Sequence, residues 1–235
     1  DSKCIGYMWI KNLSNNNCLI KSMYVNKKDN CSEYYNVLIN LLKGKKNLIY
    51  TCEENEYNYQ ILKSIGFEKC TGTIELYREI DNADKSILNF CEKDITFDTV
   101  KKGKDEEKRC IIQNSIFKSS DRTPLTVEDI CCDESQNYYI EDGAVFIKLG
   151  DKCIGYGQII IRGSDPLVVN FGLIKEYRGM GYGKLLMGYL FDIMKKHNFK
   201  KVYIKVKSDN MSALSLYKYC GFKTCSILNT WYLKS

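Results

Sequence analysis

The segment Arg178–Lys184, which reads RGMGYGK, is the part of the sequence whose composition points most directly to chemistry. Its three alternating glycines remove Cβ atoms, so backbone N–H groups can approach a phosphate closely. A β-rich run, Leu167–Ile174, precedes the segment, and apolar residues of helical period follow it from Leu185. A helix that starts here adds free N–H groups and the positive end of its dipole, so the sequence predicts a binding site for a diphosphate.

Other glycine-rich phosphate loops fit this segment less well. A P-loop needs the pattern G-x4-G-K-[ST], but Leu185 follows Lys184 and Arg178 stands at the first glycine position. A Rossmann fingerprint needs G-x-G-x-x-G, whereas the spacing here is G-x-G-x-G. A tight turn that uses its glycines only for their conformation remains an alternative at this point.

The elements around this loop predict an α+β fold with a mixed sheet. Thr126 is a candidate N-cap for a short helix, and Gly221 a candidate left-handed C′ residue. We expect helices over Lys104–Ser119, over the residues after Thr126, over Leu185–Lys196 and over Met211–Tyr219. Expected strands are Ile95–Val100, Ala144–Leu149, Lys152–Ile161, Leu167–Ile174, Lys201–Lys207 and Lys223–Lys234, with a hairpin turn at Gly150-Asp151.

The chain repeats itself. Lys3-Cys4-Ile5-Gly6-Tyr7 recurs as Lys152-Cys153-Ile154-Gly155-Tyr156. A second set follows in the same order, in which Asn55, Lys63, Gly66-Phe67, Cys70 and Tyr77 match Asn210, Lys218, Gly221-Phe222, Cys225 and Tyr232. We therefore predict two copies of one domain type, with a partial, degenerate domain over 1–80, a linker over 81–93 and an intact domain over 94–235. Since the first copy has very few residues before its first matched strand, we expect the sequence to be part of a longer protein.

Two motifs in the second copy resemble those of the GNAT superfamily of acyl-CoA-dependent N-acyltransferases. Motif A, [RQ]-x-x-G-x-[GA], is filled by Arg178, Gly181 and Gly183. Motif B corresponds to Asn210-x-x-Ala213-x-x-Leu216-Tyr217-x-x-x-Gly221-Phe222. The resemblance extends over 94–235, and the front half is similar to the degenerate copy of tandem-GNAT proteins, with Leu62 in the place of Tyr217. It implies a tandem GNAT-like fold and acetyl-CoA as the cosubstrate.

The resemblance also implies a set of cofactor-binding residues. In the family, two parallel strands separate and the pantetheine arm pairs with exposed main chain between them. Here the strand 170–174 would supply these partners, the glycine loop would hold the diphosphate, and the residue that opens motif B would bind the pantetheine arm. The predicted cofactor-binding residues are Gly172, Leu173, Ile174, Arg178, Gly179, Met180, Gly181, Tyr182, Gly183, Lys184 and Asn210.

Tyr217 is the predicted catalytic residue. An amine would attack the thioester directly, and a phenol close to sulfur would assist the departure of coenzyme A. A core-facing aromatic side chain is the alternative role for Tyr217. The general base stays open: Gln158 and Asn170 occupy the inward positions of the central strands, and the remaining candidates are Glu134, Glu141, Asp142 or a chain of water molecules.

The predicted function is therefore an N-acetyltransferase that acts on a primary amine, which we expect to belong to a small molecule. A protein N-terminus or lysine is an alternative acceptor. A non-catalytic acyl-CoA-binding regulatory protein is an alternative of another class, although Tyr217 argues against it. A front copy that binds its own acyl-CoA would take up two cofactor equivalents, and we expect one.

The composition of the chain argues against several other classes of protein. The net charge of +6 is too small to argue for nucleic acid, and no run of 18 apolar residues predicts a membrane span. Twelve scattered cysteines without a CxxC pair favour reduced thiols and a cytoplasmic location. We expect no metal site, because His197 is the single histidine and is predicted to lie at the surface. The sequence does not indicate the oligomeric state.

Overall fold

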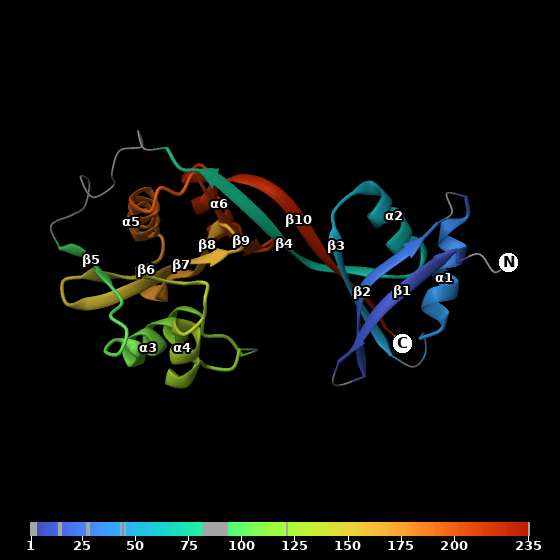
Figure 1. The fold of residues 1–235 in the computed structure, drawn as a ribbon, viewed down its shortest axis with the longest axis horizontal. Coiled ribbons are helices and arrows are strands. Elements are labelled where there is room, and N and C mark those ends of the chain that lie inside the picture. The colour runs from blue at the N-terminus through green and yellow to red at the C-terminus, as the bar shows by residue number, and fades with distance from the viewer. Residues whose placement is uncertain are drawn as a thin grey trace. The chain divides into compact units, whose positions relative to one another are not determined.

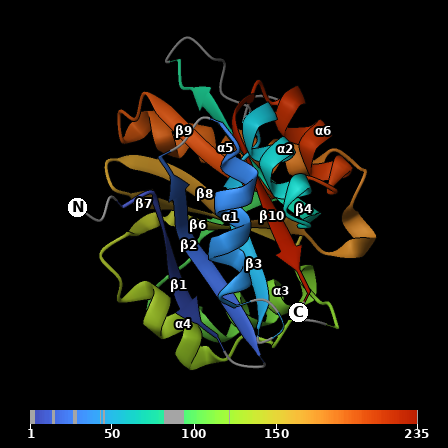
Figure 2. The same ribbon diagram turned by 90° about the vertical axis from the view of Figure 1, so that its right-hand side faces the viewer.

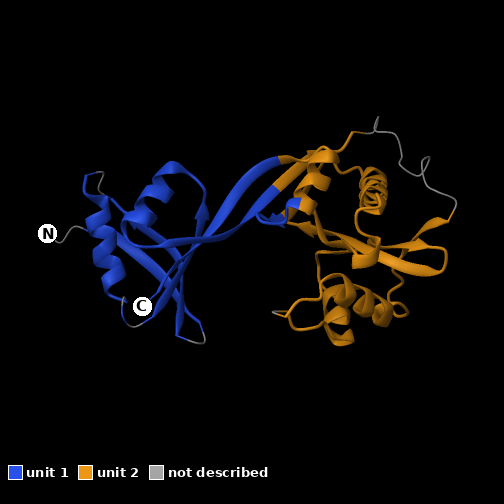
Figure 3. Ribbon diagram, turned by 180° about the vertical axis from the view of Figure 1, so that it is seen from behind, with its two compact units in different colours: residues 1–75, 206–211, 224–235 blue, residues 76–205, 212–223 orange. Residues whose placement is uncertain are grey.

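The computed structural model describes residues 4–13, 16–26, 29–42, 44, 46–81, 94–120 and 122–234. The chain forms two compact units, which Figure 3 shows in different colours. The first unit contains residues 1–75, 206–211 and 224–235, and the second contains 76–205 and 212–223. This division differs from the sequential one predicted above, because the last strand of the chain is part of the first unit. The predicted linker, beyond Asp81, lies outside the described residues.

The first unit is a mixed sheet with two helices. Its strands follow the order β1-β2-β3-β10-β4, in which β2 and β3 are parallel and β3 and β10 antiparallel. Figure 2 shows α1 lying across one face of this sheet. The elements are β1 (Gly6–Asn12), β2 (Asn17–Val25), α1 (Cys31–Asn40), β3 (Asn47–Glu53), α2 (Glu56–Ser64), β4 (Glu68–Glu79) and β10 (Lys223–Leu233), the last two of which also contribute residues to the second unit.

Alternating apolar residues of these strands form the core of the first unit. Ile20 and Leu48 are buried beneath Ile39 of α1, and Trp231 of β10 joins the same cluster. Asn55 caps α2, because its side chain accepts a hydrogen bond of 2.8 Å from the N–H of Asn58. The first unit therefore has its own core, which includes the end of the chain.

The second unit is a mixed sheet between two pairs of helices. Its strands follow the order β4-β9-β8-β7-β6-β5. In Figure 1, α5 and α6 lie on one side of this sheet, and α3 and α4 lie on the other. The elements are β5 (Ile95–Thr99), α3 (Glu106–Ile116), α4 (Val127–Glu134), β6 (Tyr139–Leu149), β7 (Lys152–Arg162), β8 (Asp165–Leu173), α5 (Tyr182–Lys196), β9 (Lys201–Lys207) and α6 (Met211–Tyr219).

The sequence patterns predicted these elements closely, and the α+β mixed-sheet class is confirmed. Strand β9 and helix α6 have the predicted limits, whereas β6 begins earlier, at Tyr139, than the apolar run suggested. Thr126 forms the capping box of α4 with Asp129, and Gly221 has the left-handed φ of 82° expected after α6.

The same order of elements occurs twice along the chain. The series β1, β2, α1, β3, α2, β4 has its counterpart in β7, β8, α5, β9, α6, β10. Gly66 follows α2 with a φ of 89°, as Gly221 follows α6. The repeated sequence segments therefore coincide with repeated elements.

The described residues also bear on the expectations for membrane-spanning helices and for cysteines. None of their helices has both the length and the apolar character that a membrane span requires. The described cysteines are all free thiols, and Cys18 and Cys110 are buried among apolar side chains, as expected for cysteine acting as a small hydrophobic residue.

Candidate active site

The predicted phosphate loop connects β8 to α5. After β8 the chain makes a 3₁₀ turn at Lys175–Tyr177, and α5 begins at Tyr182. Gly179 and Gly181 have φ values of 80° and 89°, which L-residues with a side chain rarely adopt. At both positions no heavy atom lies within 4 Å of the place that a Cβ would occupy. The conformation therefore requires glycine here, and the space beside the loop is open.

The N-terminus of α5 presents main-chain N–H groups to that open space. Gly181 is the N-cap and provides no side-chain hydrogen bond to the helix. Lys184 donates its N–H to the oxygen of Gly181, and Arg178 donates its N–H to the oxygen of Lys175. Within the described part of the chain, the N–H groups of Gly179, Met180 and Gly181 have no recorded partner. This is the arrangement in which a helix N-terminus binds an anion.

The side chain of Arg178 connects the loop to β8 and to the end of α3 by hydrogen bonds. Its Nε donates to the oxygen of Leu173 at 2.9 Å, and its Nη2 donates to the oxygen of Ile116 at 2.8 Å. Ile116 ends α3, so the guanidinium also donates to one of the carbonyl groups that have no partner within that helix. The guanidinium of Arg178 is thus engaged with main-chain oxygens of the protein, and the role of the predicted cofactor residues toward a ligand stays a prediction.

The other loop residues have separate roles. A Cβ on Gly183 would lie 3.0 Å from a side-chain carbon of Leu216, so glycine allows α5 and α6 to pack closely. The Nζ atom of Lys184 lies 3.5 Å from the ring centre of Tyr219. The ring of Tyr182 packs against Tyr177, and Met180 is exposed.

Strands β8 and β9 separate close to the start of this loop. In these described strands the parallel register joins Leu167 to Tyr203 and Val168 to Ile204, and no later pair. Asn170 then adopts a left-handed φ of 49°, which interrupts the extended strand. Unpaired strand edges can pair with an extended ligand that carries amide groups, as the pantetheine arm does. The predicted divergence of two parallel strands is therefore present.

The predicted main-chain partners on β8 are partly engaged within the protein. The N–H of Ile174 donates to the oxygen of Ile154 at 3.0 Å, and the oxygen of Leu173 accepts from Arg178. Gly172 packs against α3, where a Cβ would lie 2.5 Å from Ile116. A ligand on this strand must use the main-chain groups that remain.

Tyr217 lies on α6, buried beside the separating strands. It is 5% exposed, and its ring packs against Phe171 at 6.0 Å and against Phe222 at 5.9 Å between ring centres. Burial, and in second place the nearby Cys220, raise the pKa of Tyr217 well above its usual value. No partner of its hydroxyl is recorded among the described residues. The phenol therefore stays protonated and can donate a hydrogen bond to a ligand.

Asn210 directly precedes α6, where its N–H donates to the oxygen of Lys207 at 3.0 Å. It belongs to the residues 206–211 that are grouped with the first unit. Its role toward the pantetheine arm therefore remains a prediction from the motif.

The residues expected to point inward on the central strands do so. Gln158 of β7 is fully buried and accepts a hydrogen bond from the side-chain amide of Asn170 at 3.2 Å. It also accepts one from Arg109 of α3 at 3.0 Å. Sequence reasoning missed Arg109, although a charged residue on the apolar face of α3, one turn before Ile112 and Gln113, signals a buried polar partner.

The candidate bases occupy different places. Asp142 pairs with Lys196 and His197 at the end of α5, whereas the glycine loop is at its beginning, about 22 Å away along a helix of this length. Glu141 is exposed. Glu134 is buried against Arg109, and burial raises the pKa of its carboxyl group. His197 is thus a partly exposed residue that shares a hydrogen bond with Asp142. Among the described residues no group of side chains is placed to hold a metal ion.

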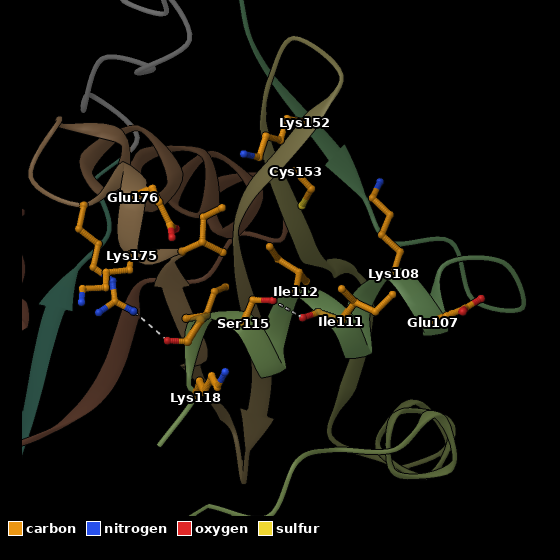
Figure 4. A pocket seen from close by; sticks show the side chains of 13 residues that line it. Glu107, Lys108, Ile111, Ile112, Ser115, Lys118, Lys152, Cys153, Lys175 and Glu176 are labelled. Carbon is orange, nitrogen blue, oxygen red and sulfur yellow. Dashed lines mark hydrogen bonds between the residues drawn. The ribbon is translucent and has the colours of Figure 1, made fainter. Parts of the chain in front are cut away.

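A pocket of about 880 Å³ borders the loop on the side of α3 (Figure 4). Of the predicted cofactor residues, Ile174 and Arg178 line it. Its wall carries more basic than acidic side chains, which favours an anionic ligand. The basic lining residues are Lys108, Lys118, Lys152, Lys175 and Arg178, and the acidic ones are Glu107 and Glu176.

Comparisons with known proteins agree with this geometry. Residues 114–222 match the model of the Acetyltransferase (GNAT) family. The matched range contains the glycine loop, the separating strands and Tyr217, so these residues are similar to the family to which the two sequence motifs point.

Individual relatives and structures are similar over longer ranges. N-alpha-acetyltransferase RimI of Mycobacterium tuberculosis is 27% identical over 132 residues, which are 54% of this chain and 78% of that protein. A GCN5-related N-acetyltransferase from Sphaerobacter thermophilus has a TM-score of 0.77 at 13% identity, covering 97% of this chain and 76% of that one. A tandem GNAT protein from the clavulanic acid biosynthesis pathway has a TM-score of 0.62 at 11% identity, covering 97% and 78%. Both structural likenesses show the fold.

The chain spans only part of several other curated relatives. For three of them, the match covers between 34% and 57% of the relative's length. The similarity to these relatives is therefore limited to the matched part of each protein.

Proposed function

We propose that this protein is an N-acetyltransferase that transfers the acetyl group of acetyl-CoA to a primary amine. The observation that carries the proposal is the loop before α5, where Gly179 and Gly181 are left-handed and the N–H groups face open space. The loop N–H groups would bind the diphosphate, and the unpaired edges of β8 and β9 would bind the pantetheine arm. Such a site has no evident use in a protein that binds no nucleotide-like cofactor.

The proposed reaction is a direct displacement. The lone pair of the neutral amine forms the new C–N bond with the thioester carbon, and the electron pair of the C–S bond leaves with sulfur. Tyr217 donates a hydrogen bond to the departing thiolate. Because the raised pKa keeps Tyr217 protonated at neutral pH, the donor is present before the reaction begins. Of the two protons that an ammonium group loses, one ends on the sulfur and the other in solvent.

The acceptor that we propose is the amine of a small molecule, which follows from the similarity of the front half to tandem-GNAT proteins. A protein N-terminus is a second candidate, favoured by the likeness to an N-alpha-acetyltransferase over 78% of that relative. The repeated order of elements supports a tandem arrangement in which the first copy is degenerate.

The test is the release of free thiol from acetyl-CoA in the presence of small primary amines and of a peptide with a free N-terminus. We expect thiol release, and we expect Tyr217→Phe to lower kcat about 100-fold while binding of acetyl-CoA is retained. Tyr189→Phe is the matched control, because Tyr189 is stacked on Phe97, which a phenylalanine preserves.

The result separates the alternatives. Release with small amines alone supports the proposed acceptor, and release with the peptide alone favours the protein N-terminus. Tight binding of acetyl-CoA without release on either kind of amine would favour a non-catalytic binding protein. Absence of binding would contradict the site itself.

A further inference from the structure

A cluster of buried polar side chains lies between α3, α4 and the sheet of the second unit. At its centre is Arg109, which is 1% exposed. Its Nη1 donates to Glu134 at 2.9 Å, and its Nη2 donates to Asp133 and to Gln158. The cluster fixes the end of α4 against β7, and it is separate from the glycine loop and from Tyr217.

Hydrogen bonds connect this cluster to the point where β8 and β9 separate. Asn170, the left-handed residue of β8, donates to Gln158 Oε1 at 3.2 Å. Gln158 Nε2 in turn donates to Asp133 Oδ2 at 3.0 Å. Asp133 is thus two hydrogen bonds away from the strand opening that would receive the thioester in the proposed function.

Different side chains of β7 and β8 face the two sides of the sheet. Asn170 and Gln158 face α3, since Gln158 contacts Arg109. Phe171 packs against Tyr217 of α6 on the other side. In the proposed function the donor to the leaving sulfur acts from the side of α5 and α6, which leaves the side of α3 and α4 for the approach of the amine.

Asp133 is the accessible carboxylate of the cluster. Its side chain is 24% exposed, whereas that of Glu134 is 1% exposed. The hydroxyl of Tyr138 donates to Asp133 Oδ1 at 2.9 Å and orients the group. The cluster has two carboxylates for one guanidinium, and at its rim Lys102 and Glu106 carry opposite charges. The excess negative charge favours a cationic partner at the accessible group.

Several buried polar atoms in and beside the cluster lack a partner. They are Arg109 Nε, both amide atoms of Gln113 one helical turn further along α3, and the hydroxyl of Tyr139, whose ring lies 5.6 Å from Arg109 Cζ. Gln113 is 1% exposed. Buried polar groups are normally paired, so the cluster is completed by a polar ligand or by ordered water.

We propose that Asp133 binds the ammonium group of the acceptor, so that the site selects amines that are cationic at neutral pH. This inference rests on the proposed function, because the thioester defines where the acceptor must lie. Tyr138, Gln158 and Arg109 hold the carboxylate of Asp133, and Arg109 also donates to Gln158.

The test is calorimetric binding of benzylammonium and of benzyl alcohol to the protein saturated with coenzyme A. The two probes have similar shapes, and only the first carries a charge. We expect the wild-type protein to bind benzylammonium at least 10-fold more tightly. Asp133→Asn should abolish that preference, whereas Asp133→Glu should keep part of it. Glu128→Gln, an exposed change on the same helix, is the matched control and should leave the preference intact.

The outcomes are decisive in both directions. An equal affinity of the wild-type protein for the two probes overturns the inference, and so does a preference that survives in Asp133→Asn. If this variant does not fold, the carboxyl ¹³C signal of Asp133 in the wild-type protein decides, since it must shift with benzylammonium and not with benzyl alcohol. A separate titration with coenzyme A alone tests the proposed function. If coenzyme A does not bind, the proposed function fails and this inference fails with it.

Discussion

At the scale of single residues, the second unit keeps several tyrosine hydroxyls away from water. Burial raises the pKa of Tyr156 and Tyr217 far above the ordinary value, and it raises the pKa of Tyr139 to about 12. These groups are neutral at any physiological pH. They can therefore donate hydrogen bonds, but they do not act as bases.

The shift at Tyr139 predicts a loss of stability in alkaline solution. Its folded pKa of about 12 is above the ordinary value of 10.0, so the unfolded chain loses this proton first. The stabilising contribution is complete below pH 10 and declines as the pH rises toward 12. Tyr139→Phe should reduce the decline in the free energy of unfolding by about 1 kcal/mol, since the residue is only partly buried. Urea denaturation between pH 7 and 11 measures this.

The exposed Tyr219 provides the comparison for that experiment. Tyr219→Phe should follow the wild-type protein over the whole range. A decline of equal size in Tyr139→Phe and in the wild-type protein would show that other groups cause the alkaline loss.

Residues whose identity depends on the local backbone conformation could be predicted from the sequence. Residues whose role depends on contacts with distant parts of the chain could not. Gly179 and Gly181 were recognised because their spacing reflects a conformation that few other residues adopt. The inward contact of Arg178 with Ile116 was not foreseen, because it depends on a helix end 62 residues earlier in the chain. The same holds for Arg109, whose partners come from α4 and β7.

At the scale of elements, the decisive unit is the succession of β8, the glycine loop and α5. The strand loses its neighbour β9 after Val168, and the following helix begins without a side-chain cap. The β-rich run, the glycine spacing and the helical period predicted the three parts, since each is a local property of the chain. What they could not give is the degree to which main-chain groups of β8, such as the N–H of Ile174, are already engaged.

A substitution in the loop should separate the effect of conformation from that of ligand binding. Gly181→Ala places a side chain at a φ of 89°, and Gly163→Ala does so at 66° in the turn between β7 and β8. Neither Cβ would meet an atom within 4 Å. Both variants should lose about 1–2 kcal/mol of stability, as for a left-handed residue with a side chain. Only Gly181→Ala should weaken binding of coenzyme A, by 10-fold or more in calorimetry.

Equal affinities of the two glycine variants for coenzyme A would argue against a role of the loop N–H groups. A loss of affinity in Gly163→Ala would point to a general effect of destabilisation instead.

At the scale of the whole molecule, the two similar series of elements differ in the residues that would bind a cofactor or take part in catalysis. The helix that corresponds to α5 in the first unit is α1, and its N-cap is Asn30 rather than a glycine loop. Leu62, at the position of Tyr217, is buried in an apolar core. The sequence indicated this asymmetry through the distribution of glycines, but the exchange of β10 into the first unit was not evident from a repeat that runs in order along the chain.

The asymmetry predicts that one chain binds one equivalent of coenzyme A. Titration calorimetry of the whole protein should give a stoichiometry of one, and Gly181→Ala should weaken that single binding event. Two equivalents, or one that Gly181→Ala does not affect, would assign a binding site to the first unit.

The pairing of β10 with β3 also has a consequence for synthesis on the ribosome. Leu228–Leu233 pair with residues 48–53, and Trp231 belongs to the core around Leu48. Nascent chains usually fold from the N-terminus as each domain emerges. Here β3 is synthesised well before β10, so the sheet of the first unit closes only after β10 has emerged, and the apolar faces of its earlier strands stay uncovered until then.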